Sequence, residues 1–456
     1  MRHARETRGH AGRAAHTGHT GRAEHVAILG NIIVYLIMAC MVAGGVASMV
    51  KPESELGKQF VEGICSIGPI FFSVAGIFAS IPFLVQFIEG AFGPLFALVG
   101  ADPAMAATTV IAVDMGGYQA ADALAQTRES WIMAMYTGFM AGATIVYTVP
   151  IGLRMIGKND QKYFALGIMC GFLAIPIGVL AASVITALAN PVVRDVISTN
   201  AEATYQLALS FGLIFQNLVP LVVACVLIAL GLHFIPNGMI RGFTVFGRFI
   251  DYAARTVLVC CILEHFTGVF TLAFGGWGFD PIMADAESLE RAVEVVCSIA
   301  MMLAGAFPMV YLVKTYLAKP LGRLGRLFGL SEMATAGMLA AAANALALFP
   351  MVRDMRAEDK VKTVAFSVCG AFLIGDHLSF AANFQPTLIV PLFVGKLLAA
   401  GAAVAFVRFL ALQKARALEQ EDLRAQAAAD GTGKDAAGAG GGAPLPDGAD
   451  AEGQPA

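Results

Sequence analysis

The chain has 456 residues, of which 57% are hydrophobic and only 14% are Asp, Glu, Lys or Arg. Soluble domains carry about 25% charged residues, so this composition excludes a water-exposed globular domain. The formal net charge of −3 argues against a nucleic-acid partner. Long apolar runs indicate instead an all-α, polytopic integral membrane protein.

The two ends of the chain differ in composition from the rest. Residues 1–25 are rich in His, Arg, Gly and Thr, and residues 413–456 are rich in Ala, Gly, Pro and Asp. Neither composition can bury a core, so we expect a disordered basic N-terminal tail and a disordered C-terminal tail. The transmembrane domain is then expected at 26–412.

Two features of the sequence bear on metal binding, the His-rich start and the cysteines. The His-rich start could bind metal, but a disordered tail explains it better. The eight Cys lack metal-ligand spacing and lie in apolar runs, which favours buried packing thiols. The sequence therefore predicts no metal site and no cofactor.

Nine apolar segments are long enough to cross a ~30 Å hydrocarbon core as helices. In chain order they are 26–50, 63–88, 131–156, 163–189, 205–234, 249–274, 292–313, 361–384 and 387–412. Two further stretches, 93–124 and 333–350, are interrupted by small residues and are expected to be spans, broken helices or re-entrant loops. The sequence thus predicts about 10–11 transmembrane helices.

Basic residues are distributed unevenly among the loops. The loops rich in Lys and Arg are at 154–162, 314–326 and 353–362, and the poor ones are at 51–62, 190–204 and 275–291. The positive-inside bias makes the first set cytoplasmic and the second external. The N-terminal tail, which holds five Arg, is then also expected on the cytoplasmic side.

The two halves of the chain resemble each other faintly. Residues 62–85 resemble 293–313, and residues 97–108 resemble 326–337, at an offset near 230 residues. At this offset, the interrupted stretch 93–124 in the first half corresponds to the interrupted stretch 333–350 in the second half. Duplicated halves with broken helices at matching positions often build a substrate site near the membrane midplane, so the pattern favours two structural repeats.

Asp114 is an ionisable residue that lies within an otherwise apolar segment. Such a side chain costs ~2.5–3.5 kcal/mol on insertion scales, so it needs a reason. It lies in IAVDMGGYQAADAL, where Gly116 and Gly117 weaken a helix and could free backbone carbonyls beside the carboxylate. A carboxylate with freed carbonyls could hold a small cation, and Tyr118 could add an aromatic face. The alternative is a re-entrant turn in which Asp114 caps a helix start.

A second polar centre lies in CGAFLIGDHLSFAANF. On a helix, Asp376, Ser379 and Asn383 share one face and align a carboxylate, a hydroxyl and an amide. His377 points elsewhere and could pair with another helix or titrate. The alternative is a hydrogen-bond network that only holds the helix bundle together.

Three further residues are weaker candidates. Asn217 lies shortly before Pro220 and could hydrogen-bond the carbonyls that the proline leaves free. Asn344 lies in the second interrupted stretch. Lys396 could pair with Asp376 or could extend to a membrane surface, and we expect the second.

No enzyme motif is found in the sequence. GxxxxGK[ST], HExxH and GxSxG are absent, so neither direct ATP drive nor hydrolysis is expected. The pair Asp376–His377 alone is too little to argue catalysis. The chain is therefore predicted not to be an enzyme.

Several blocks, in this order and spacing, carry a resemblance to a known family. They are VDMGGYQAADALA (113–125), GATIVYTVPIGL (142–153), KYFALGIMCGFLAIPIG (162–178), QNLVPLVVACVLIALGLHFIP (216–236) and GDHLSFAANFQPTLIVPLFVGKLLAAG (375–401). The chain resembles the EutH family, the ethanolamine permeases of ethanolamine-utilisation operons. The resemblance covers 26–412, which is the expected transporter domain.

The resemblance implies a substrate with a specific chemistry. Ethanolamine is a two-carbon amino alcohol that is mostly protonated at neutral pH, and the ammonium form does not cross lipid unaided. Its pocket needs a buried carboxylate, a polar partner for the hydroxyl and little room. The candidate substrate-binding residues are Asp114 and Asp376 for the charge, Tyr118 for cation–π support, and Asn217, Asn344, Ser379 and Asn383 for the hydroxyl.

We therefore expect a multi-pass protein of the bacterial inner membrane that admits ethanolamine for catabolism, as a facilitator or a secondary transporter. One alternative is an H⁺- or Na⁺-coupled carrier of another small organic solute. Another is an intramembrane enzyme that uses Asp376 and His377. The expected partners are a small amine and the lipid bilayer, and the sequence leaves open whether the protein forms a homo-oligomer.

Overall fold

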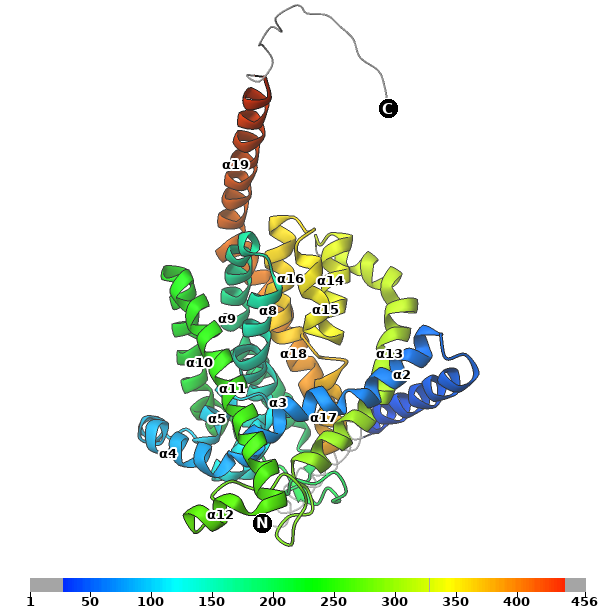
Figure 1. Ribbon diagram of the computed structural model, residues 1–456, viewed down its shortest axis with the longest axis vertical. Coiled ribbons are helices and arrows are strands. Elements are labelled where there is room, and N and C mark those ends of the chain that lie inside the picture. Colours follow the sequence, from blue (N-terminus) through cyan, green and yellow to red (C-terminus); the bar gives the residue numbers. More distant parts are fainter. Residues whose placement is uncertain (1–27, 328, 439–456) are drawn as a thin grey trace, which may run out of the picture.

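The computed structural model describes residues 28–327 and 329–438, and these are almost entirely helical (Figure 1). Within those ranges the strands are two residues each, β1 (Val192–Val193) and β2 (Tyr205–Gln206), paired antiparallel. In the part of the chain that the structure describes, seven helical segments are long and apolar enough to cross a membrane. They are Ile28–Val50, Ile81–Leu98, Arg128–Met155, Lys158–Ala189, Phe211–Phe234, Ala292–Arg323 and Pro386–Ala425. The all-α, polytopic class is confirmed.

The elements fall into long helices and short, interrupted ones. The long helices include α4 (Ile81–Leu98), α9 (Gln161–Ala189), α10 (Phe211–Phe234), α11 (Pro236–Thr267), α13 (Ala292–Leu327) and α18 (Ile389–Phe406). The short ones include α2 (Glu55–Cys65), α3 (Ile67–Ala79), α12 (Val269–Phe274), η3 (Lys158–Asp160) and η4 (Pro386–Leu388). One spanning segment runs from α7 (Arg128–Thr137) through the π-helical η2 (Gly138–Thr148) into α8 (Val149–Met155).

Two predicted continuous spans are interrupted. The segment 63–88 divides into α2, α3 and α4 at Ser66 and Ser80, whose hydroxyls donate to the carbonyls of Gly63 (2.6 Å) and Gly76 (2.7 Å). Serine bonds of this kind bend helices. The segment 361–384 divides into α16 (Ala357–Gly370) and α17 (Asp376–Phe384).

The interrupted stretch 93–124 contains a re-entrant hairpin, which we call the first hairpin (residues 102–126). It consists of α5 (Ala104–Val110), η1 (Val113–Met115) and α6 (Gly117–Leu124). Helices of 7 and 8 residues span only about 10–12 Å, too little to cross the bilayer. Both ends are held by Asp102, whose carboxylate accepts the backbone N–H groups of Ala104 and Gln126, each at 2.9 Å. The chain therefore enters and leaves on the same side.

The stretch 333–350 lies in a second hairpin (residues 331–352). It consists of α14 (Glu332–Ala343) and α15 (Ala345–Val352), with Asn344 at the turn between them. Lys362 in α16 donates to the carbonyl of Gly329 at 3.3 Å, so the segments before and after the hairpin lie together. Because the hairpin does not cross, the basic loops on either side of it share one face, as the charge bias predicts.

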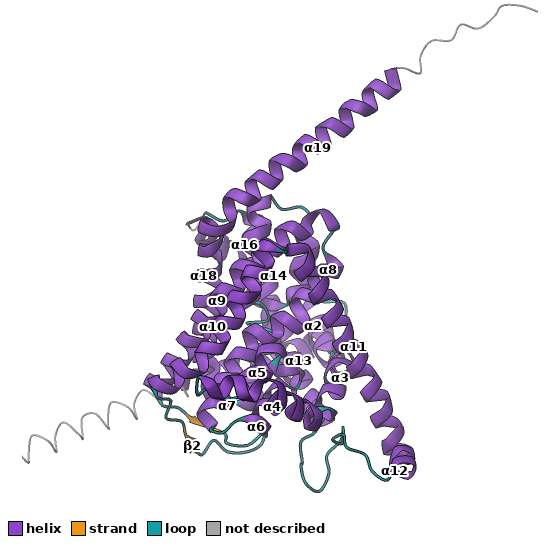
Figure 2. Ribbon diagram, turned by 90° about the vertical axis from the view of Figure 1, so that its left-hand side faces the viewer, coloured by secondary structure: helices purple, strands orange, loops and turns teal. Residues whose placement is uncertain are grey.

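The same order of elements occurs in both halves of the chain. A hairpin is followed by an interrupted spanning segment and then by a long helix, which is α9 in the first half and α18 in the second. These two helices pack closely, because a Cβ at Gly395 would lie only 2.7 Å from the carbonyl oxygen of Gly178. In Figure 2, α6 and α7 lie at one end of the bundle and α8 and α16 at the other. This arrangement agrees with the predicted repeat.

One end of the bundle is held by ion pairs between residues that are distant in the sequence. At the end that carries α19 (Leu412–Gly438), Lys360 pairs with Asp160 at 2.6 Å and Lys162 pairs with Asp422. The hydroxyl of Tyr163 also donates to Asp422 at 2.7 Å. The helical and partly docked course of this segment differs from the disordered tail expected from residue 413.

The start of the helix Ile28–Val50 lies at the opposite end. A Cβ at Gly30 would meet the carbonyl oxygen of Pro386, at the end of α18 that is distant from α19. The neighbouring Thr387 donates to Val192 at 2.9 Å, in the loop with few basic residues. This placement differs from the expectation that the N-terminal side of this helix shares the face of the basic loops. Residues 1–25, with the His-rich tract, lie outside the described residues.

Candidate functional site

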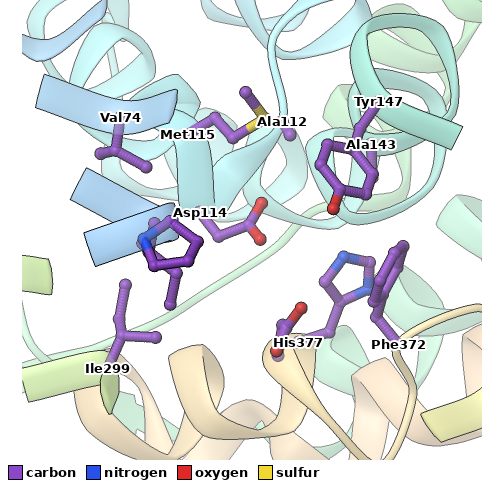
Figure 3. A pocket seen from close by; sticks show the side chains of 12 residues that line it. Val74, Ala112, Asp114, Met115, Ala143, Tyr147, Ile299, Phe372 and His377 are labelled. Carbon is purple, nitrogen blue, oxygen red and sulfur yellow. The ribbon is translucent and has the colours of Figure 1, made fainter. Parts of the chain in front are cut away.

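A small cavity of about 110 Å³ lies where the first hairpin, η2 and the junction between α16 and α17 meet (Figure 3). Its polar lining comes from two carboxylates, an imidazole and a phenol, and the rest is apolar. The lining residues are Pro69, Ile70, Val74, Ala112, Asp114, Met115, Ala143, Tyr147, Ile299, Phe372, Asp376 and His377. Two of the seven predicted substrate-binding residues, Asp114 and Asp376, are therefore brought together.

Asp114 reaches the cavity because the hairpin turns sharply beside it. Gly116 has a φ of +94°, and a Cβ there would lie 3.1 Å from Cγ2 of Ile77. The neighbouring Gly117 donates its N–H to the carbonyl of Ala112 at 2.9 Å. This left-handed turn favours glycine strongly. The expected re-entrant turn is present, and the carboxylate faces the cavity instead of capping α6.

Asp376 reaches the cavity because α16 stops and α17 restarts. Phe372 in the junction has a φ of +59°, which is unusual for a residue with a bulky side chain. The second hairpin holds this conformation, since Phe372 and Ile374 donate their N–H groups to Ala341 (3.0 Å) and Ala342 (2.9 Å). Asp376 is then the first residue of α17, where the helix dipole favours a negative charge.

Both carboxylates face the cavity without a protein cation in contact. Neither side chain forms an ion pair or a side-chain hydrogen bond with another described residue. Lys396 attracts Asp114 only from beyond ion-pair distance, and the two carboxylates repel each other. A negative pair at membrane depth needs compensation. The arrangement is therefore suited to hold a small cation between Asp114 and Asp376.

Lys396 neither pairs with Asp376 nor extends to a membrane surface, which corrects the sequence-based expectation. Its side chain is fully buried, and Nζ lies 2.9 Å from both the carbonyl oxygen of Phe139 and Nδ1 of His377. The reason is that α18 packs in the centre of the bundle, so acceptors on other elements are nearer than water. His377, expected to point elsewhere, lines the same cavity as Asp376.

Tyr118 and Asn217 lie outside the cavity lining. Tyr118 is fully buried, with its ring stacked on Trp131 at 4.5 Å and its hydroxyl accepting from Nε2 of Gln385 at 2.9 Å. Asn217 accepts the N–H of Asp102 at 2.8 Å and donates to the hydroxyl of Ser130 at 3.1 Å. Tyr118 therefore packs against neighbouring side chains of the first hairpin, and Asn217 joins α10 to the base of that hairpin.

The remaining three predicted residues also lie outside the lining. Ser379 donates to the carbonyl of Gly375 at 3.0 Å, and Asn383 donates to the carbonyl of Ser298 at 3.0 Å. The side chain of Asn344 accepts the N–H of Leu346 at 2.8 Å and so caps α15. The predicted spacing on α17 is present, but only Asp376 of that face lines the cavity.

The sequence-based reasoning missed Tyr147. It lies in η2 and lines both the main cavity and a second one of about 70 Å³, which also includes Met115, Arg154 and Asp251. In Figure 3 its hydroxyl points toward the same space as Asp114 and His377. A tyrosine inside an apolar segment is a weak signal by itself. Within the described residues, no group of three or more His, Cys, Asp or Glu is placed to hold a metal ion.

Comparisons with known proteins agree with the resemblance. The chain is 37% identical over 396 residues to a Listeria monocytogenes protein named "Probable ethanolamine permease EutH", covering 86% of this chain and 98% of the relative. Proteins of the same name from Salmonella typhimurium and Escherichia coli are 35% and 34% identical over 360 residues, covering 78% of this chain and 85% of each relative. No solved structure matches the chain. The family described as "Ethanolamine utilisation protein, EutH" matches residues 29–410, so the chain belongs to this family.

Proposed function

We propose that the protein carries ethanolamine across the bacterial inner membrane into the cell, and that the ammonium form is the one carried. The observation that carries this proposal is the placement of Asp114 and Asp376 on one small buried cavity without a protein cation in contact. The names of the relatives supply the substrate, since each is called a probable ethanolamine permease.

The size of the cavity supports a very small solute. Its volume of about 110 Å³ is well above the ~10–15 Å³ that one water needs, and well below the ~300–1,000 Å³ of pockets for drug-sized ligands. A two-carbon amino alcohol is in the right range. A nucleotide or a sugar is not.

The chemistry of the lining supports the charged form of the substrate. A neutral amine crosses lipid unaided, whereas an ammonium needs a pathway and a counter-charge. As the external pH falls, the neutral fraction of ethanolamine shrinks and the pathway becomes necessary. The absence of a phosphate-binding motif in the sequence favours a facilitator or a secondary transporter, and the permease relatives favour a protein that does not alter its substrate chemically.

The distribution of charge supports an orientation. The face with Lys162 and Lys360 is assigned to the cytoplasm by the positive-inside bias. The start of the helix Ile28–Val50 is then external, because Gly30 lies at the opposite end of the bundle. Labelling in intact cells of single cysteines placed at exposed residues 200, in the loop that follows Val192 at that same end, and 158 tests this orientation. Labelling of residue 158 alone by an impermeant reagent would overturn it.

The test of function is uptake of labelled ethanolamine into proteoliposomes at mildly acidic pH, with and without a proton gradient. We expect uptake well above that of empty liposomes. Asp114→Asn and Asp376→Asn should each lower it by at least about tenfold, because losing one charge of a desolvated pair costs about 2–5 kcal/mol. Glu287→Gln, an exposed acid in the loop before α13, is the matched control and should retain full uptake.

The possible results separate the hypotheses. Uptake indifferent to the gradient identifies a facilitator, and accumulation driven by an H⁺ or Na⁺ gradient identifies an ion-coupled carrier. Absence of uptake by folded protein would overturn ethanolamine as the substrate. Full uptake in both carboxylate variants would overturn the site. Mass analysis of the solute that has entered, which should be unchanged ethanolamine, tests the enzyme alternative.

A further inference from the structure

The imidazole of His377 packs between two aromatic rings and beside Lys396, and it lines the cavity. Its ring lies 4.9 Å from the ring of Phe139 and 5.3 Å from that of Phe372, measured between centroids. Its backbone N–H donates to the carbonyl of Phe372 at 3.2 Å, and Nδ1 lies 2.9 Å from Nζ of Lys396. The side chain is only 2% exposed, yet it lines the cavity. Its orientation is therefore fixed by packing.

The contact with Lys396 also bears on the tautomer. When Lys396 carries its charge, its ammonium has only donors, so Nδ1 of His377 accepts from it and the ring proton lies on Nε2. The titratable groups that face Lys396 are His377 on α17, Cys369 on α16 and Asp114 in η1. From α9, the backbone of Gly178 and the methyl of Ala182 pack against α18.

The lining thus presents three kinds of polar group. Asp114 and Asp376, when ionised, only accept hydrogen bonds, His377 in this tautomer offers an N–H donor, and the phenol of Tyr147 can donate or accept. Ethanolamine has the complementary pattern, with an ammonium that only donates at one end and a hydroxyl oxygen that can accept at the other. The side chains of Ser379 and Asn383, which the sequence suggested for the hydroxyl, donate to backbone carbonyls outside the lining.

We propose that His377 recognises the hydroxyl oxygen of the substrate through Nε2–H, and that Lys396 is the positioning residue that holds this tautomer. This assignment rests on the proposed function and adds the element that distinguishes an amino alcohol from a simple amine. The carboxylates then bind the charge, which ethylamine and ethanolamine share. The histidine reads the hydroxyl, which only ethanolamine has.

The experiment compares the KM for ethanolamine with the KM for ethylamine in the same proteoliposomes. The wild type should prefer ethanolamine, because a site built to bond a hydroxyl rejects the analogue that lacks it. His377→Leu should raise the KM for ethanolamine by about tenfold, because it removes one hydrogen bond whose contribution lies near the upper end of the usual range. The KM for ethylamine should be nearly unchanged. His377→Gln restores a donor and should recover part of the preference.

Lys396→Met tests the positioning role. Without the ammonium the ring proton can lie on either nitrogen, so the preference for ethanolamine should fall by several-fold while uptake of ethylamine persists. Ser183→Ala is the matched control, because this buried hydroxyl on α9 has no partner within the described residues and does not line the cavity. It should keep the preference of the wild type. Size-exclusion chromatography and thermal unfolding in detergent report whether each variant folds. If His377→Leu does not fold, His377→Gln and Lys396→Met decide the test.

The outcomes distinguish this inference from the proposed function. A wild type that takes up neither amine overturns the proposed function. A wild type that takes up both, with a preference for ethanolamine that folded His377 variants keep, leaves the proposed function intact and overturns the role of His377. A preference lost in the His377 variants but unchanged in Lys396→Met overturns the positioning role of the lysine.

Discussion

The two re-entrant hairpins occupy equivalent places in the order of elements, but they serve the cavity differently. The first hairpin places the side chain of Asp114 in the lining. The second contributes none of the lining residues, and its backbone carbonyls at Ala341 and Ala342 hold the junction that presents Asp376. One half therefore supplies its acid from a hairpin and the other from a spanning segment. A repeated fold can build a site whose two halves are chemically similar and structurally distinct.

The hairpins also differ in how they are closed. The first is closed at its base by a charged group, since Asp102 accepts two backbone N–H groups. The second has a neutral cap, Asn344, at its turn. Bonds to an ionised acceptor are stronger than bonds to a neutral one. The first hairpin should therefore depend more on a single side chain than the second.

Asp102→Ala should give the largest change in stability. It removes two charge-assisted hydrogen bonds, each worth about 1.5–3 kcal/mol, so a loss of about 3 kcal/mol is expected. Thermal unfolding of the purified protein measures it. Asp102→Asn, which keeps an acceptor, should lie between the variant and the wild type. An unfolding temperature of Asp102→Ala equal to that of the wild type would show that the base of the hairpin is held by other contacts.

Gly116→Ala should give the next largest change. A residue with a Cβ in the left-handed region costs about 1–2 kcal/mol, and the new methyl would press on Ile77 at 3.1 Å. Gly401→Ala is the matched control, because that position is helical and has open space around it. It should stabilise the protein by about 0.5–1 kcal/mol instead. Equal effects at the two positions would argue against a conformational requirement at the tip of the first hairpin.

Asn344→Ala tests the second hairpin and should be milder. It removes one neutral cap, which is worth about 1 kcal/mol. Asn344→Ser, which can still cap α15, should restore most of the stability. Thermal unfolding of both variants beside Asp102→Ala compares the two hairpins directly, and a larger loss at residue 344 than at residue 102 would reverse the comparison.

Tyr118→Phe should give the smallest change. It removes the hydrogen bond between the hydroxyl and Gln385 but keeps the ring stacked on Trp131. Gln385 also donates to the carbonyl of Arg194 at 2.8 Å, so its amide keeps a partner. A loss of about 0.5–1 kcal/mol is expected in thermal unfolding. A loss as large as that of Asp102→Ala would mean that this hydroxyl, and not the acid at the base, holds the first hairpin.

Several features could be predicted from the sequence because they follow from the cost of polar groups in lipid. An acid within an apolar segment marked Asp114 and Asp376, and small residues marked both hairpins. The partners of the other polar residues could not be predicted, because they depend on packing between distant segments. Asn217 bonds the base of a hairpin 115 residues away, and Lys396 bonds a carbonyl 257 residues away.

The burial of Lys396 also orders the assembly of the bundle. A lysine at the centre of an isolated helix costs about 2.5–3.5 kcal/mol on insertion, and this cost is offset only once acceptors are nearby. Those acceptors are the carbonyl of Phe139 and the ring of His377, both made earlier in synthesis than α18. The last long apolar helix therefore reaches its final depth only against partners that are already in place. An unpaired lysine in the membrane would mark a chain that has not finished folding.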